Sequence, residues 1–269
     1  MSEFSVEWLT LRERYDLRAR NPAVLVAVTS LLKSKSSVRV IDLACGTGST
    51  LRTLSPHLPA RQHWDLVDKD PYLLNAACGG KSSGDVSLNA VQLDLNGDVE
   101  MMLNRPTDLI TISALIDLVS EAWLDRFACH VAERALPVYA ALTYDGRIDL
   151  SPTDPTDAAI AAAVNAHQQT DKGFGPALGP SAAAAAISRF EALGYSVLQG
   201  TSDWVIGTAD QEIQIELLNG WAIAASEIES LPSREIDNWL IRRKTAVDRC
   251  ASTMRVGHVD FVATPSTTR

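Results

Sequence analysis

The stretch VRVIDLACGTG, residues 38–48, decides the fold that this chain is expected to adopt. Its first half is a short apolar run, which predicts a buried strand, and its second half is a glycine-rich turn. Residues 49–58, after the turn, can form a helix. Glycine permits a tight turn and lets the backbone approach a ligand closely. A strand, a glycine turn and a helix in this order therefore predict a ligand site in an α/β sheet.

The segments around this stretch alternate between strands and helices. We expect further strands over 63–68, 87–93, 108–113 and 138–143, and helices over 5–19, 22–34, 71–78 and 121–134. Strands that alternate with helices are usually parallel and covered on both faces. The predicted fold class is therefore α/β: a doubly wound, mainly parallel, seven-stranded Rossmann-like sheet with helices on both faces.

The pattern changes after residue 143. Residues 144–180 are rich in proline and glycine around one alanine-rich segment, 158–166, which favours a helix. After them we expect a helix over 181–193, strand pieces at 195–197 and 203–206, helices over 209–228 and 234–251, and a final strand over 255–263. The expected organisation is one domain, 1–269, made of an N-terminal helical cap (1–36), a cofactor-binding core (37–143), an insertion that acts as a substrate lid (144–180) and a C-terminal part of the sheet with a helical insertion (181–269).

The charge and composition limit the possible partners. The net charge of −9 argues against a nucleic-acid partner, because phosphate contacts favour a basic surface. The basic stretches 12–20 and 242–244 fit solvated helix faces. The four cysteines form no metal or redox pair, the N-terminus has no apolar signal segment, and no apolar run is long enough to span a bilayer. We expect a cytoplasmic protein with no metal and no membrane partner; a homodimer is compatible with the sequence, which does not define the oligomeric state.

The glycine turn differs from two common nucleotide motifs. The dinucleotide fingerprint requires a third glycine where this chain has Leu51. A phosphate-binding P-loop requires a Lys-Ser/Thr pair, which the turn lacks. Both comparisons direct the interpretation away from NAD and from nucleoside triphosphates.

The turn resembles the first motif of the class I S-adenosylmethionine-dependent methyltransferases, in the form found in bacterial small-molecule enzymes. That motif is an acidic residue followed by a small residue and two spaced glycines, which Asp42, Ala44, Gly46 and Gly48 match, with Ala44 where the family often has glycine. The resemblance covers residues 37–143. It implies a Rossmann-like fold, S-adenosylmethionine as the cofactor and methyl transfer as the reaction. Cys45, inside the turn, is expected to line the cofactor site as a packing residue.

Two further acids follow the second and third expected strands. Asp68, next to Lys69, can accept hydrogen bonds from both ribose hydroxyls. Asp70 is the alternative for this role. In similar proteins an acid at the position of Asp94 accepts from the adenine amino group, and the next residue, Leu95, lines the ring. Asp94 can instead cap the turn that follows it.

Residues on other segments complete the expected cofactor site. Ser113 and Ala114 follow the fourth strand, where strand ends face the ligand crevice of an open α/β sheet. Arg12 and Tyr15 share a helix face with Trp8. Arg12 could pair with the cofactor carboxylate, and Tyr15 could lie beside the sulfonium. The alternative is an ordinary amphipathic helix, with Trp8 buried and the stem of Arg12 lying along the apolar surface.

Three residues are candidates for catalysis. His167, in the insertion, is the first candidate for a general base because its ordinary pKa is near neutrality. Asp117 follows the fourth strand and either faces the substrate or is a loop acid. His258 shares a strand face with Asp260 and either acts as a base or is a structural histidine.

The methyl acceptor is expected near the ends of the fourth and fifth strands and the insertion. We assign Tyr144, Arg147, Lys172 and Trp204 to its binding site. Trp204 is the residue suited to stack on a flat substrate, although tryptophans here are more often part of the core. In-line methyl transfer needs the acceptor atom close to the methyl group, so positioning supplies much of the catalysis.

The sequence therefore predicts an S-adenosylmethionine-dependent methyltransferase that methylates oxygen or nitrogen of a small molecule. Alternatives are a protein or nucleic-acid methyltransferase, an adenosyl-ligand-binding protein without catalysis and an NAD-dependent oxidoreductase. The segment after the fourth strand, 113–116, lacks the Asn/Asp-Pro-Pro-Tyr/Phe motif that methyltransferases use on flipped bases and amide nitrogens. That difference weakens the first alternative.

Overall fold

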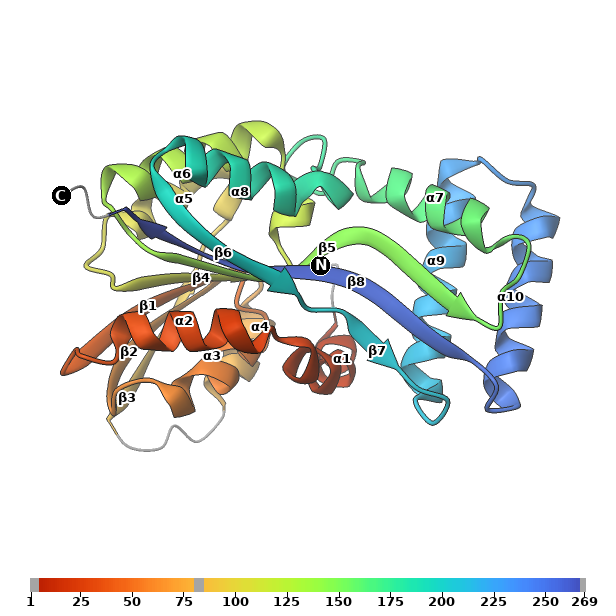
Figure 1. Cartoon of the computed structure of the whole chain (residues 1–269), viewed down its shortest axis with the longest axis horizontal. Coiled ribbons are helices and arrows are strands. Elements are labelled where there is room, and N and C mark those ends of the chain that lie inside the picture. Colours follow the sequence, from red (N-terminus) through yellow and green to blue (C-terminus); the bar gives the residue numbers. More distant parts are fainter. Residues whose placement is uncertain (1–4, 80–84, 267–269) are drawn as a thin grey trace.

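The chain builds one central sheet, seen in a computed structural model that describes residues 5–79 and 85–266 (Figure 1). Within these residues the sheet has eight strands in the order β3-β2-β1-β4-β5-β8-β6, and β7 pairs with β8 beside β6. The strands are β1 (Ser37–Leu43), β2 (Arg61–Asp68), β3 (Val86–Gln92), β4 (Leu109–Ser113), β5 (Val138–Ser151), β6 (Tyr195–Thr201), β7 (Trp204–Ile206) and β8 (Thr253–Pro265). The outer ends of the predicted domain, 1–4 and 267–269, lie outside the described residues.

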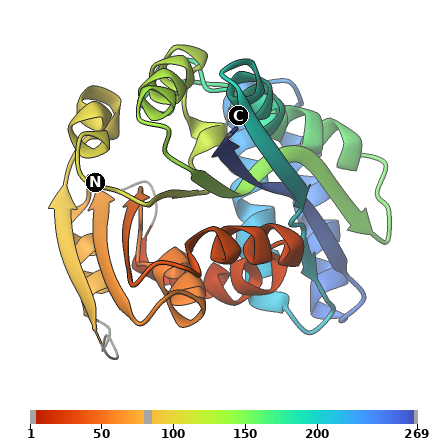
Figure 2. The ribbon, with the colours of Figure 1, turned by 60° about the vertical axis from the view of Figure 1, so that its left-hand side comes forward.

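Helices cover both faces of the sheet. They are α1 (Val6–Ala19), α2 (Pro22–Leu32), α3 (Ser49–Leu54), α4 (Pro71–Cys78), α5 (Leu95–Leu103), α6 (Glu121–Glu133), α7 (Asp157–Gln168), α8 (Ala182–Ala192), α9 (Gln211–Ile228) and α10 (Ser233–Asp248), with short 3-10 turns at Ser55–His57, Ile116–Leu118 and Gly179–Ser181. Figures 1 and 2 show α5, α6 and α8 on one face and α2, α3 and α4 on the other. Each layer buries its own apolar cluster against the strands. None of the described helices is both long and apolar enough to cross a membrane.

The pairing confirms the predicted mainly parallel α/β sheet. β1 to β5 are joined by parallel pairs, whereas β8 runs antiparallel to β5, β6 and β7. The predicted count of seven strands is wrong by one. Residues 195–206 form two strands, because the chain leaves β6 after Thr201 and pairs again with an earlier stretch of β8 from Trp204.

The fifth strand is longer than predicted. It was expected to end at residue 143, but β5 continues to Ser151 and stays paired with β8. Two register shifts, between Ala140 and Thr143 and between Tyr144 and Ile148, interrupt the pairing. Leu142, in the first of them, has a positive φ of 53°. Bulges of this kind bend a strand without ending it, so residues 144–151 belong to the sheet and not to an insertion.

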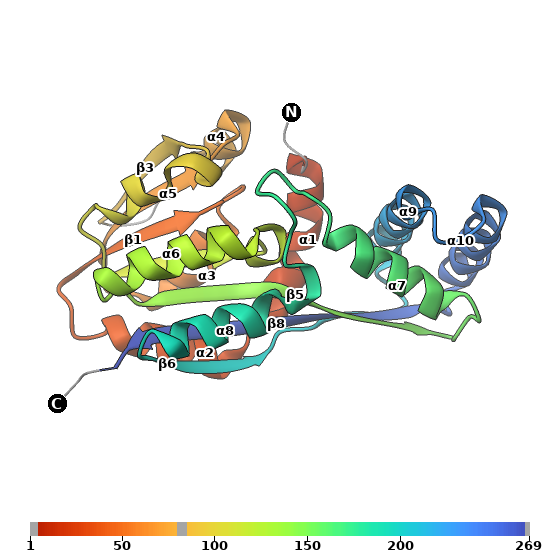
Figure 3. The ribbon, with the colours of Figure 1, turned by 90° about the horizontal axis from the view of Figure 1, so that it is seen from above.

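The extended parts of β5 and β8 carry a helical module made of α7, α9 and α10. Figure 3 shows both strands running from the sheet to these helices. The module has its own apolar cluster, which includes Trp221 and Trp239 and which α1 joins through Tyr15. Inside the module, Arg243 is 2% exposed and forms an ion pair with Asp157. The prediction of a solvated basic face at 242–244 is therefore wrong for Arg243.

Helix α5 was not predicted. Its N-terminus is capped by Asp94, whose side chain accepts a hydrogen bond from the backbone N–H of Asn96 at 3.0 Å. Val99 and Leu103 bury its apolar side under the sheet. Asn96 and Gly97 at its start have weak helix propensity, which made this segment look like a turn.

Candidate functional site

A cavity of about 260 Å³ lies at the carboxyl ends of β1, β2, β3 and β4. This is the edge at which open α/β sheets bind ligands. Helix α1, the turn after β1, the segments after β3 and β4 and the loop between α7 and α8 form its walls. Figure 3 shows that loop beside α1, which places two segments far apart in the sequence at one entrance.

The structure brings most of the predicted cofactor residues to this cavity. Those that line it are Arg12, Ala44, Cys45, Gly46, Asp68, Lys69, Asp94, Leu95, Ser113, Ala114 and, among the predicted acceptor residues, Lys172. The other predicted site residues are outside the lining: Tyr15, Asp42, Gly48, Asp117, Tyr144, Arg147, His167, Trp204 and His258. Lining residues that sequence reasoning did not single out include Leu9, Asp16, Thr50, Leu73, Leu118 and Phe174.

The glycine turn is held in a conformation that few side chains tolerate. Ala44, Gly46 and Gly48 all have positive φ, at 51°, 54° and 85°. A Cβ on Gly46 would lie 3.2 Å from the side chain of Leu9, so the turn also needs glycine where α1 crosses it. Gly48 does not line the cavity; it precedes the first turn of α3 and gives the backbone its left-handed step into the helix. Cys45 packs in the turn, and burial raises the pKa of its thiol.

Asp68 connects the end of β2 to the glycine turn. One carboxylate oxygen accepts from the backbone N–H of Gly46 at 2.9 Å, and the other accepts from the N–H of Asp70 at 3.0 Å. Burial raises the pKa of Asp68, and these two N–H groups oppose that rise. Each oxygen keeps a further lone pair, so the carboxylate can accept from a ligand as well. Asp70 is outside the lining and caps α4 through the N–H of Tyr72.

The segment after β3 combines an acid with apolar walls. Asp94 both lines the cavity and caps α5, so the two interpretations of this residue from the sequence are compatible. Leu73, Leu93 and Leu95 line the cavity near it. Leucine side chains with one acceptor nearby suit a flat heteroaromatic ring that carries an amino group.

Asp42 lies beneath the turn and not in the lining. It is 1% exposed, and its Oδ1 accepts from the hydroxyl of Thr111 at 2.7 Å. Its Oδ2 has no hydrogen-bond partner among the described residues. Burial raises the pKa of Asp42 to about 7, against the effects of the Thr111 hydrogen bond and the Arg20 charge. A buried acceptor without a partner is costly.

Arg20 is a functional candidate that the sequence did not reveal. It ends α1, is 3% exposed, and donates to the hydroxyls of Ser113 at 3.1 Å and Thr50 at 3.4 Å, both of which line the cavity. Burial lowers the pKa of its guanidinium, and Tyr139, Asp260 and Asp16 more than offset this effect. The solvated basic face predicted for 12–20 is wrong for Arg20. A buried arginine within an amphipathic helix has the same local pattern as an exposed one, so no local signal distinguishes it.

Helix α1 places an ion pair in the cavity wall. Arg12 bonds Asp16 at 3.1 Å, and its guanidinium lies 5.0 Å from the ring centre of Trp204. Trp204 donates from Nε1 to Asp16 at 3.0 Å, so it contacts both members of the ion pair. Because its side chain is only 4% exposed, it is not free to stack on a substrate. Tyr15 points elsewhere: it is 1% exposed and donates to Asp210 at 2.8 Å. The sulfonium contact proposed for Tyr15 is therefore not supported.

Asp117 and His258 are buried behind Arg12. Each has one polar atom, Oδ1 of Asp117 and Nδ1 of His258, without a partner among the described residues. Burial and the nearby Arg12 charge lower the pKa of His258 to about 3, which makes it a weak base. Asp260 does not orient it, because that carboxylate accepts from the backbone N–H groups of Asn21 and Leu142. The structure therefore does not support His258 as a base oriented by Asp260.

The stability of the protein should depend on the charge of Asp117. Burial raises its pKa from 3.8 to about 6, so the folded protein binds this proton more tightly than the unfolded chain does. The stabilisation is complete below pH ~4 and is lost as the pH rises through 6. Asp117→Asn should raise the free energy of unfolding at pH 8 by about 3 kcal/mol and have little effect near pH 4, as measured by urea denaturation. An equal effect at both pH values would contradict this expectation.

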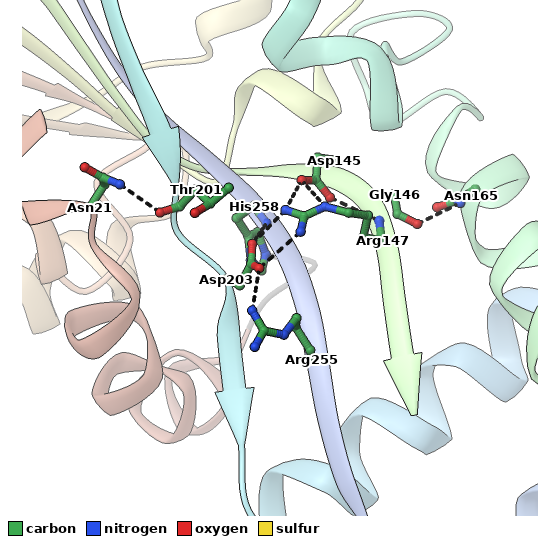
Figure 4. A network of polar contacts seen from close by, with 9 residues as sticks. All are labelled: Asn21, Asp145, Gly146, Arg147, Asn165, Thr201, Asp203, Arg255 and His258. Carbon is green, nitrogen blue, oxygen red and sulfur yellow. Dashed lines mark hydrogen bonds and ion pairs between the residues drawn. The ribbon is translucent and has the colours of Figure 1, made fainter. Parts of the chain in front are cut away.

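Arg147 belongs to a polar network on the extended strands, outside the cavity. Figure 4 shows it bonded to Asp145 and Asp203, with Arg255 sharing Asp203. Its Nη2 is 2.7 Å from Asp203 Oδ1. Tyr144, on β5 beside this network, donates to Asn165 at 2.7 Å and so ties the strand to α7. Tyr144 therefore holds α7 to the strands, Arg147 joins β5 to the segment between β6 and β7, and the acceptor roles predicted for both are not supported.

His167 also lies outside the cavity. Its Nε2 is 2.8 Å from Glu227 of α9, and its Nδ1 is 3.4 Å from the ammonium of Lys172. A general base must reach the acceptor, so the position of His167 does not support that role. No group of three or more histidine, cysteine, aspartate or glutamate side chains in the described part of the chain could hold a metal ion.

Comparisons with known proteins agree on the fold. The sequence matches no protein-family model and no curated protein sequence. The solved structure of the YcgJ protein from Bacillus subtilis matches with a TM-score of 0.50 at 12% identity, over 92% of this chain and 100% of that chain. A cyclopropane-fatty-acyl-phospholipid synthase-like protein from Lactobacillus casei matches with a TM-score of 0.50 at 12% identity, over 96% and 94%. A third match, with a TM-score of 0.46 at 15% identity over 98% and 100%, is an S-adenosylmethionine-dependent methyltransferase from Thiobacillus denitrificans in complex with S-adenosylhomocysteine.

Five strands joined in parallel are followed by an antiparallel β8 inserted between β5 and β6. The chain therefore has a mainly parallel, Rossmann-like α/β fold, which it shares with the solved structures of YcgJ and of the cyclopropane-fatty-acyl-phospholipid synthase-like protein.

Proposed function

We propose that this protein is an S-adenosylmethionine-dependent methyltransferase that acts on a small molecule. One observation carries the proposal: Asp68 at the end of β2 and Asp94 after β3 converge with a glycine turn of positive φ at one edge of the sheet, and Asp42 of β1 lies buried beneath that turn. A dinucleotide would also require room for a pyrophosphate at this turn, where Leu51 replaces the third glycine of the fingerprint.

The residues present fit an adenosyl ligand. Asp68 has free lone pairs for the ribose hydroxyls, and Asp94 with Leu95 offers an acceptor and an apolar wall to the adenine. Ser113 and Ala114 line the part of the cavity assigned to the methionine chain. S-adenosylmethionine, when bound, supplies an activated methyl group.

The chain's own contribution is to position the acceptor and exclude water. Leu9, Leu118 and Phe174 provide an apolar wall beyond the cofactor residues, and the Arg12–Asp16 pair fixes one polar edge. Holding the acceptor in line with the methyl group supplies most of the rate enhancement that such a site needs.

A small acceptor is supported by the charge and by the enclosure of the cavity. The net charge of −9 is unfavourable for a polyanionic nucleic acid. Helix α1 and the loop between α7 and α8 flank the cavity, and a ligand site enclosed in this way supports a small acceptor.

The test has two steps. Calorimetry with S-adenosylhomocysteine should detect binding to the wild type. After reaction of labelled S-adenosylmethionine with a cell extract, ultrafiltration and chromatography should place label in a small molecule that is separate from the unreacted cofactor. Binding without transfer would indicate a non-catalytic adenosyl-binding protein. Label retained with protein or nucleic acid would contradict the small-molecule proposal, and absence of adenosyl binding would contradict the proposal as a whole.

A further inference from the structure

Two lysines, Lys69 and Lys172, line the cavity without an ion pair among the described residues, and of the two only Lys172 is half-buried, whereas Lys69 is exposed. Lys172 lines the cavity and is half-buried, yet no carboxylate lies within ion-pairing distance of its ammonium among the described residues. The acids of the lining are engaged elsewhere: Asp16 with Arg12, Asp68 with the glycine turn and Asp94 with the start of α5. A partly desolvated ammonium without a counterion favours an anionic ligand.

A histidine side chain lies beside this ammonium. His167 Nδ1 lies 3.4 Å from Lys172 Nζ, while the opposite ring nitrogen, Nε2, lies 2.8 Å from Glu227. An imidazole that donates from Nε2 to Glu227 has an Nδ1 lone pair that accepts from the lysine. The chain Glu227–His167–Lys172 therefore orients the ammonium without neutralising it, which leaves its charge available to the cavity.

Hydrogen bonds and an aromatic contact hold the loop that carries Lys172 in one conformation. Asp171 accepts from the N–H groups of Gly173 at 2.7 Å and Gly175 at 2.9 Å. Asn96 of α5 donates to the carbonyl of Gly173 at 2.8 Å, and the ring of Phe174 lies edge-on to Trp123. These contacts fix the backbone on both sides of Lys172, so its ammonium has a defined position at the entrance.

We propose that the methyl acceptor carries an anionic group, a carboxylate or a phosphate, which binds the ammonium of Lys172, and that His167 is the residue that positions it. The inference rests on the proposed function and names the substrate class of the same cavity. The apolar side chains Leu118 and Phe174 suit the uncharged body of such a molecule. Lys172 is tied to α7 of the helical module, whereas the residues assigned to the ribose and adenine follow β2 and β3.

The experiment uses matched pairs of probes. The full chain, saturated with S-adenosylhomocysteine, is titrated with small carboxylic acids that have aromatic, short aliphatic and long aliphatic bodies, each beside its primary amide, and with phosphate monoesters beside their parent alcohols. At least one anion should bind about tenfold more tightly than its neutral partner, as one charge-assisted contact predicts. If the acids bind more tightly than their amides, the anionic group is a carboxylate. If the phosphate esters bind more tightly than their alcohols, it is a phosphate.

Variants of the chain link the preference to these residues. Lys172→Met should remove the preference for the anion and leave the affinity for S-adenosylhomocysteine unchanged, while Lys172→Arg should retain most of it. Lys33 is an exposed lysine at the C-terminal end of α2, and Lys33→Met should change neither the preference for the anion nor the affinity for S-adenosylhomocysteine. His167→Leu should weaken anion binding and spare the neutral partners, an effect that a merely structural role would not produce.

Several results would overturn the inference. The first is that no anion binds more tightly than its neutral partner, and the second is that the preference for the anion persists in Lys172→Met. The third is a loss of cofactor affinity in Lys172→Met, which would assign the lysine to the cofactor. A wild type that binds no S-adenosylhomocysteine would overturn the proposed function and this inference together. A wild type that binds it and shows no anion preference would overturn the inference alone.

Discussion

Replacing Asp68 with alanine is expected to weaken the binding of S-adenosylhomocysteine by about 100-fold, which corresponds to two lost charge-assisted hydrogen bonds. The carboxylate accepts from the backbone N–H of Gly46, and it is the residue assigned to the ribose hydroxyls. The variant therefore loses a ligand contact and also releases the glycine turn, which needs this acceptor to hold its positive φ values. Isothermal titration calorimetry measures both the affinity and the enthalpy of the lost contacts.

Asp70 provides the matched control, since it is an aspartate two residues away in the same loop. It caps α4 through the N–H of Tyr72 and does not line the cavity. Asp70→Ala should cost about 1 kcal/mol of stability and leave the affinity for the ligand within about twofold. Equal losses of affinity in the two variants would show that the loop as a whole matters and would contradict the ribose assignment to Asp68.

Replacing Asp260 with alanine is expected to lower the free energy of unfolding by about 3–5 kcal/mol. Asp260 is completely buried, and its oxygens accept from the backbone N–H groups of Leu142 at 2.8 Å and Asn21 at 2.9 Å. Its charge also supports the buried guanidinium of Arg20. The variant leaves two buried donors without an acceptor and removes a negative charge near a buried cation. Urea denaturation near neutral pH measures the loss.

Asp85 is the matched control for this substitution. Its side chain is 70% exposed, with Arg61 4.0 Å away, and exposed pairs of this kind contribute little. Asp85→Ala should change the free energy of unfolding by less than about 0.5 kcal/mol. A loss below about 1 kcal/mol in Asp260→Ala would show that water or a rearranged side chain satisfies the two N–H groups.

The strands of the core were predictable because their signals are local. An apolar run that ends in a glycine turn, as at 38–48, specifies a buried strand and the loop after it without information from distant residues. The acids Asp68 and Asp94 were found for the same reason, since the ends of parallel strands meet at one edge of a sheet. The prediction of the cofactor cavity depended only on those positions.

Features that depend on distant contacts were not predictable. Arg20 is buried because Ser113, Thr50 and Tyr139 surround it, and no pattern within α1 distinguishes it from the exposed Arg18. The continuation of β5 past residue 143 depends on pairing with β8, more than 100 residues later. His167 has the sequence context of a catalytic base, but its role follows from Glu227 on another helix. In each case the deciding partner is far away in the sequence.

The extended strands determine how a ligand can enter. Two hydrogen-bonded strands, β5 and β8, run without a chain break from the sheet into the helical module. Two paired strands resist bending more than a single-chain linker does, and the bulge between Tyr144 and Ile148 is the point at which this pair can bend. We therefore expect the helical module to move less relative to the sheet than a domain on a flexible linker would. We expect the cofactor and the acceptor to enter the cavity when α1 or the loop that carries Lys172 moves locally.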